Sequence, residues 1–122
     1  MVTKLHSAFA LSMLMLAIGT EAEAQSKDRL VQCRIESGGK VALNGPCRFM
    51  AESGGSFGLE NADRNKPLLG DILTMSVSII SPDAAEVRGL TRAGINSRWG
   101  EARRAKSDPA CWDGSDFRIC AR

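Results

Sequence analysis

The sequence predicts an all-β fold: a small antiparallel β-barrel or sandwich of about seven short strands, held together by two disulfides. Three observations predict it. Short segments alternate apolar and polar side chains, Gly-rich turns separate these segments, and four cysteines occur in a chain of 122 residues. Strands with one apolar face need a second layer to cover that face, which a barrel or two packed sheets provide.

The first strands are expected between residues 30 and 59. Residues 30–35 alternate, with Val31, Cys33 and Ile35 on one face. Ser37-Gly38-Gly39 predicts a turn into a return strand at 41–43, and Asn44-Gly45-Pro46 predicts a second turn. Strands at 47–51 and 56–59 are then expected on either side of another Ser-Gly-Gly turn.

The clearest strand is residues 72–80, where Leu73, Met75, Val77 and Ile79 alternate with threonine and serines. Another strand is expected at 86–91, where Gly89 marks a bulge or a close approach. A strand at 95–99 follows. Because Gly100 interrupts the pattern and 101–106 (EARRAK) has high helix propensity, a short helical turn or a loop is expected there.

The chain ends in a predicted hairpin around residues 113–116 (DGSD). If Cys111 faces Cys120, then Trp112 faces Ile119 and Asp113 faces Arg118. The disulfide and the ion pair then share one face, and the two apolar side chains share the core face. The turn sequence, the register and the chemistry of the facing pairs all agree with one hairpin, which strengthens the prediction of both the hairpin and its disulfide.

The four cysteines (Cys33, Cys47, Cys111 and Cys120) predict two structural disulfides, as in small secreted domains. Their spacing does not fit a metal site of the C-x-x-C type. Three pairings are open, of which we expect the local one, Cys33–Cys47 and Cys111–Cys120. Each bridge closes a short loop and contributes about 2.5–3 kcal/mol in the chain-entropy description.

Residues 1–24 predict a cleaved signal peptide, with a basic start, an apolar run at 7–19 and a small-x-small site before Gln25. The apolar run is shorter than the ~20 residues that span a membrane. Residues 25–122 are then a single small β domain without a transmembrane segment, located in the periplasm or secreted.

Composition excludes several kinds of catalysis. The only histidine is His6, inside the predicted signal, and the chain has no tyrosine. Ser-His-Asp and Cys-His catalysis and His-ligated zinc are therefore excluded for the domain. No cofactor or metal is predicted. The remaining enzymatic possibility is a carboxylate pair, but no glutamate lies in an apolar context that would raise its pKa, so we expect no enzyme. The glutamates considered are Glu36, Glu52, Glu60, Glu86 and Glu101.

The strongest candidate for partner binding is residues 96–106, with four basic residues and one acidic residue. Lys4, Glu21 and Glu23 fall in the predicted signal, so of 16 basic and 14 acidic residues 15 and 12 remain, a net charge of +3. The candidate residues are Arg98, Trp99, Arg103 and Arg104, because guanidinium beside indole suits planar anions, sugars and carboxylates.

The expected partner of this cluster is an acidic protein cleft or an anionic envelope glycan. Nucleic acid is not expected, since the basic patch is small. The alternative is a core Trp99 with solvated arginines. Ser37 and Lys40, which flank a Gly-Gly turn, are a second candidate for contact with a partner.

Two resemblances bear on function. The Cys-containing motifs resemble small uncharacterised secreted proteins of alphaproteobacteria, a likeness that implies no activity. The motifs are Cys33 with Asn44-Gly45-Pro46-Cys47, Gly55-Ser56-Phe57, and Ala110-Cys111-Trp112 with Ile119-Cys120-Ala121. Ser37-Gly38 is similar to the Ser-Gly-x-x-Tyr motif of the periplasmic inhibitors of C-type lysozyme, which are disulfide-bearing β-barrels that insert a loop into the lysozyme cleft. Val41 stands in place of that tyrosine, and their Tyr-x-x-x-Thr-Lys-Gly motif has no counterpart.

Three hypotheses follow. The first is a secreted or periplasmic binding or inhibitor module of the cell envelope, which blocks a hydrolase cleft or binds an anionic glycan. The second is a structural or stress-related envelope protein without a compact ligand site. The third is a small carboxylate-dependent hydrolase. The first is preferred, because the positive charge of the domain is concentrated in one segment that also contains a tryptophan.

Overall fold

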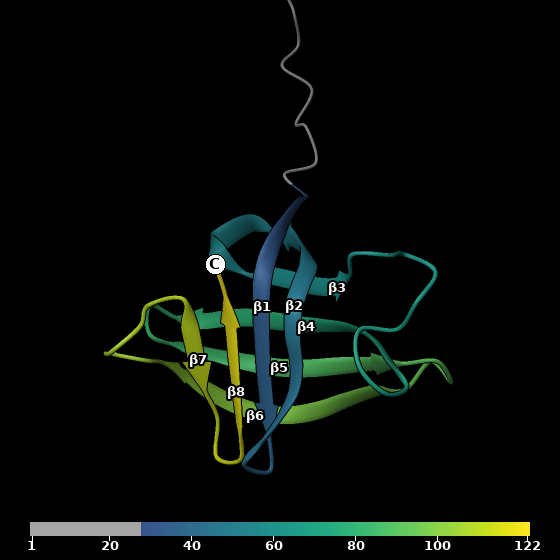
Figure 1. Ribbon diagram of the computed structural model, residues 1–122. Helices are drawn as coiled ribbons and strands as arrows, with labels where there is room; N and C mark the ends of the chain where they lie inside the picture. The colour runs from purple at the N-terminus through teal and green to yellow at the C-terminus, as the bar shows by residue number, and fades with distance from the viewer. Residues whose placement is uncertain (1–27) are drawn as a thin grey trace, which may run out of the picture.

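The computed structural model describes residues 28–122, which form eight antiparallel strands and one short 3-10 turn (Figure 1). The predicted signal peptide lies outside the described residues. The elements are β1 (Arg29–Ser37), β2 (Lys40–Ala51), η1 (Ser53–Gly55), β3 (Phe57–Asn61), β4 (Ile72–Ser81), β5 (Ala84–Thr91), β6 (Asn96–Arg104), β7 (Cys111–Asp113) and β8 (Phe117–Ala121).

The strands form a closed barrel in chain order, because β8 pairs with β1. In Figure 1, β1, β2, β7 and β8 run crosswise over β3, β4, β5 and β6, so the barrel is flattened into two layers. The all-β prediction is confirmed, and the barrel is the correct one of the two architectures predicted. The strand count is eight where about seven were expected.

The turn predicted at Asn44-Gly45-Pro46 is wrong, because β2 runs straight through it. Pro46 lies opposite Gln32, whose N–H and C=O both bond to Arg122 on the far side of β1. Pro46 therefore occupies a non-hydrogen-bonded position toward β1. Pairing of β2 with β3 ends at Cys47, so no partner requires the N–H that proline lacks.

The helical turn or loop predicted at residues 101–106 is also wrong, because β6 continues to Arg104. Val87 faces Gly100 whereas the next residue, Arg88, faces Arg98, so Trp99 is the extra residue of a β-bulge. Gly100 has a φ of 130°, which glycine adopts at little cost, and it returns the strand to register. The glycine that was expected to end the strand therefore bends it.

The core consists of the inward faces of both layers. Met75 and Val77 are fully buried in β4, as the alternation predicted, while Ser78 is exposed. At the start of the strand the prediction is wrong, because a register shift between Ile72 and Thr74 places Ile72 in the core in place of Leu73. The largest fully buried side chains also include Trp112, Ile35 and Leu59. The close approach predicted at Gly89 is confirmed, since a Cβ there would lie 3.2 Å from Ile72 and 3.3 Å from the Trp99 indole nitrogen.

The terminal hairpin has the predicted register. Cys111 faces Cys120, Trp112 faces Ile119, and Asp113 faces Arg118. Trp112 and Ile119 are in the core, and the Arg118 Nε lies 3.1 Å from the Asp113 carboxylate on the other face. The disulfides pair Cys33 with Cys47 and Cys111 with Cys120, as expected.

Gly114→Ala in the turn of this hairpin is expected to lower the free energy of unfolding by about 1–3 kcal/mol, because overpacking displaces neighbours. A Cβ at Gly114 would overlap the ring of Phe117, which is buried. Urea denaturation measures the loss. Gly45→Ala is the matched control, since nothing lies within 4 Å of its Cβ position. Equal losses in the two variants would contradict the steric explanation.

The barrel has two ends with different loops. The start of β1, the β2–β3 connection, the β4–β5 turn and the β6–β7 loop lie at one end together with the C-terminus. The β1–β2 turn, the β3–β4 loop, the β5–β6 turn and the β7–β8 turn lie at the other. In residues 28–122 there is no helix with the length and apolarity needed to span a membrane.

Candidate functional site

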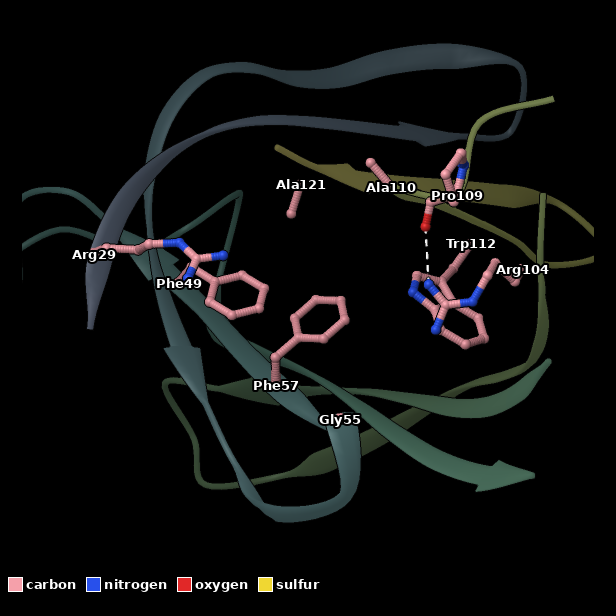
Figure 2. A pocket seen from close by; sticks show the side chains of 9 residues that line it. All are labelled: Arg29, Phe49, Gly55, Phe57, Arg104, Pro109, Ala110, Trp112 and Ala121. Carbon is pink, nitrogen blue, oxygen red and sulfur yellow. Dashed lines mark hydrogen bonds between the residues drawn. The ribbon is translucent and has the colours of Figure 1, made fainter. Parts of the chain in front are cut away.

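A pocket of about 180 Å³ opens at the end of the barrel that carries the chain terminus, and we call it the mouth (Figure 2). It combines three aromatic rings and two arginines from strands that are far apart in the sequence. The lining residues are Arg29, Phe49, Gly55, Phe57, Arg104, Pro109, Ala110, Trp112 and Ala121. Typical small-molecule pockets measure roughly 300–1,000 Å³, so the mouth fits one ring or one side chain of a larger ligand.

Arg104 forms one wall of the mouth. It is the last residue of β6 and lies directly opposite Trp112 of β7, so its guanidinium stacks over the indole with its carbon 4.3 Å from the ring centroid. Its Nη1 also donates a hydrogen bond of 2.9 Å to the Pro109 carbonyl (Figure 2). The position of this guanidinium is therefore defined by two contacts.

Arg29 forms the opposite wall by the same arrangement. It lies directly across from Phe49 in the β1–β2 register, with its guanidinium carbon 4.8 Å from the ring centroid. Phe49 in turn stacks on Phe57 with centroids 4.8 Å apart and an interplanar angle of 21°. Figure 2 shows the two arginine–aromatic pairs on opposite sides of the pocket with Phe57 between them.

The mouth arginines differ from most others in their charge partners. Of the eleven arginines in residues 28–122, eight form an ion pair with a carboxylate in that part of the chain. Arg29, Arg92 and Arg104 do not. Arg29 and Arg104 face the same pocket, and no acidic residue between positions 28 and 122 lines it. Within this part of the chain, the mouth therefore has an uncompensated charge of +2.

The other residues of the predicted cluster do not join Arg104. Arg98 and Arg103 lie outside the barrel, where Arg98 donates to Glu86 at 3.0 Å and Arg103 pairs with Glu101 at 3.3 Å. Trp99 is partly buried against the core and meets Phe117 edge-on, with centroids 5.6 Å apart. The core alternative for Trp99 therefore describes its position better than a surface anchor.

Ser37 and Lys40, the second candidate, lie at the opposite end of the barrel. They pair across Gly38 and Gly39, whose positive φ angles of 58° and 77° suit a tight hairpin turn. Gly38 donates a 2.8 Å backbone hydrogen bond to Asp116 in the β7–β8 turn, so the two hairpin turns at this end are tied together. The turn that carries Ser37 and Lys40 therefore cannot form one contact surface with the mouth.

Four of the five glutamates considered as catalytic acids are paired with arginines, whereas Glu52 is exposed and forms no ion pair in residues 28–122. Glu36, Glu60, Glu86 and Glu101 each form at least one ion pair. Glu86 receives Arg88 at 2.7 Å and Arg98 at 3.0 Å. The hydrogen bond from Arg98 lowers the pKa of Glu86, with the charge of Arg88 acting in the same direction. A general acid in a glycosidase needs the opposite shift.

The sequence pointed to Arg104 but not to the rest of the mouth. Trp112 was expected in the core, Phe57 belonged only to a motif of a resemblance that implies no activity, and Arg29 and Phe49 carried no motif. Their common feature is position, because each lies near the end of a strand that reaches the same end of the barrel. Only the order and register of the strands bring them together. No protein family, curated protein or solved structure matches the chain.

Proposed function

We propose that the protein is a binding module of the cell envelope, periplasmic or secreted, that holds an anionic group in the mouth of its barrel. The observation that carries the proposal is the pair of arginines, Arg29 and Arg104, each stacked on an aromatic ring and without a carboxylate partner in residues 28–122. Two disulfides support an oxidising compartment, which the periplasm and the extracellular space provide.

The chemistry of the mouth favours recognition over catalysis. A guanidinium presents five N–H donors in a planar fork that matches a carboxylate or phosphate. Within residues 28–122, the Arg104 side chain donates one hydrogen bond, to the Pro109 carbonyl. Its other N–H donors are therefore available to a ligand. Because stacking and this bond already fix the side chain, little conformational entropy is lost when an anion binds.

The proposal is preferred over the two other hypotheses on specific contacts. A carboxylate-dependent hydrolase would need a carboxyl group with a raised pKa, whereas the hydrogen bond from Arg98 lowers the pKa of Glu86. A structural protein without a ligand site gives no reason for placing two uncompensated arginines at one pocket. An inhibitor that acts through the Ser37–Lys40 turn would use the other end of the barrel and would leave the mouth unexplained.

Arg104→Ala is expected to weaken binding of an anionic probe roughly 10- to 100-fold, because a hydrogen bond to a charged group contributes about 1.5–3 kcal/mol. Isothermal titration calorimetry with D-galacturonate and with inorganic phosphate measures the affinity. Added salt should weaken wild-type binding. Arg104→Lys should lie between wild type and Arg104→Ala, since lysine keeps the charge but loses the planar fork.

The matched control is Arg92→Ala. Arg92 is exposed, has no carboxylate partner in the described residues and lies in the β5–β6 turn at the other end of the barrel. The Arg92→Ala substitution removes the same charge as Arg104→Ala without changing the mouth. The affinity of this variant for the anionic probes should therefore equal that of the wild type. The proposal fails if neither probe binds, or if Arg92→Ala and Arg104→Ala weaken binding equally.

A further inference from the structure

A second hollow adjoins the mouth on the outside of the barrel, and we call it the outer groove. It has a volume of about 540 Å³ and lies where β6 ends and the β6–β7 loop begins. Its lining residues are Asp83, Arg103, Arg104, Ala105, Lys106 and Pro109. Arg104 and Pro109 line both hollows, so the hydrogen bond between these two residues is the boundary that separates them.

The outer groove is also basic. Three cations line it against one carboxylate, that of Asp83. Arg103 shares its charge with Glu101, whereas Lys106 is exposed and has no carboxylate partner in residues 28–122. From Arg29 through Arg104 to Lys106, positive charge therefore continues from the mouth across its rim into the groove.

Backbone hydrogen bonds fix the floor of this path. The Arg104 N–H donates to Asp83 in the β4–β5 turn, and the Ala105 N–H donates to Cys111 in β7, both at 2.9 Å. Asp108 holds the loop that carries Pro109, because its carboxylate accepts the Ala110 N–H at 3.1 Å and pairs with Arg122. The two hollows are therefore held in one relative position before a ligand arrives.

We propose that the ligand is an acidic oligosaccharide, with one ring in the mouth and the next residues of the chain in the outer groove. This deepens the proposed function and rests on it. A continuous basic path over two hollows fits a chain with repeated negative charges better than a single small anion. Trp112 and Phe57 are buried, so the accessible apolar lining of the mouth comes from Phe49, Pro109, Ala110 and Ala121. This lining gives the apolar C–H face of a saturated ring a surface to contact, which an extended acidic peptide would not use.

Chain length provides the test. Calorimetry with D-galacturonate and its α-1,4-linked dimer and trimer should show affinity rising about tenfold or more from monomer to trimer, since a second linked contact adds avidity. D-galactose and its neutral oligomers should not bind. Lys106→Ala should bring the ratio of trimer to monomer affinity close to one. Lys40→Ala removes another exposed lysine, at the other end of the barrel, and should keep the full ratio.

The outcomes separate the two proposals. If the monomer binds but the trimer binds no more tightly, the outer groove is not a subsite and this inference falls, while the anion-binding function stands. If tri-glutamate binds as tightly as the trisaccharide, the ligand is an acidic peptide and the glycan assignment falls. If neither galacturonate nor phosphate binds, the proposed function fails and this inference fails with it.

Discussion

Reducing both disulfides is expected to lower the free energy of unfolding by about 5–6 kcal/mol, because each bridge closes a short loop and restricts the unfolded chain. The bridged residues are 14 and 9 positions apart. Domains of this size are stable by only ~5–15 kcal/mol, so the reduced protein should be largely unfolded or close to it. Urea denaturation with and without reductant measures the change, and non-reducing peptide mapping checks the pairing.

Two double variants separate the contributions of the bridges. Replacing Cys33 and Cys47 with serine, or Cys111 and Cys120, should each cost about half of the total. Cys111 and Cys120 are directly opposite, whereas Cys33 lies opposite Gly45 and reaches Cys47 diagonally. A crossed pairing in the peptide map, or a urea midpoint that reductant does not move, would contradict the prediction.

Trp112→Ala is expected to cost about 3–5 kcal/mol of unfolding free energy, the usual loss when a buried tryptophan is truncated. Trp112 is only 2% exposed, faces Ile119 and lies beneath the Arg104 guanidinium. Chemical denaturation followed by far-UV circular dichroism measures the loss. The same variant should also weaken anion binding, because the ring that fixes Arg104 is removed.

Trp99→Ala is the matched control for this prediction. Trp99 is only partly buried, so its truncation should cost less than that of Trp112 and should leave affinity for the anionic probe unchanged. Trp112→Phe keeps an aromatic ring under Arg104 and should fold well enough for its affinity to be measured. A larger loss of stability for Trp99→Ala than for Trp112→Ala would overturn the assignment of Trp112 to the core.

Some elements could be predicted because several local signals agreed. In the terminal hairpin, the turn sequence, the facing cysteines and the Trp112–Ile119 and Asp113–Arg118 pairs all require one register. From Met75 to Ile79 the alternation is regular, and the predicted apolar face is the one that packs on the core. In these segments, neighbours in the sequence are also neighbours in the fold, so local chemistry was sufficient.

Two segments could not be predicted because distant partners override local propensity. Asn44-Gly45-Pro46 has turn chemistry, but β1 pairs with β2 throughout and the proline falls where no donor is required. Residues 101–104 favour helix, but β5 pairs with them through Arg103, and Arg103 and Arg104 also pair with β7. In both cases the deciding contact comes from a strand whose position the local sequence does not give.

The residues of the mouth could not be predicted as a group from local sequence either. The sequence groups Arg98, Trp99, Arg103 and Arg104 because they are close in the chain, yet alternation along β6 sends them to different surfaces. The partner of Arg104 across the pocket is Arg29, 75 positions earlier in the sequence. Charge density along the chain identified one residue of the site, and barrel closure supplied the others.

The contact between β6 and β7 is the narrowest join in the barrel, with only two residue pairs, and one of them is Arg104 with Trp112. Arg104, which we propose presents donors to a ligand, therefore also belongs to the pairing that closes the barrel. Binding and closure are then thermodynamically linked, since a ligand that binds only the closed form stabilises it by mass action. By the same linkage, a substitution that weakens the pairing of β6 with β7 lowers the affinity for the ligand, even where the substituted residue does not contact the ligand.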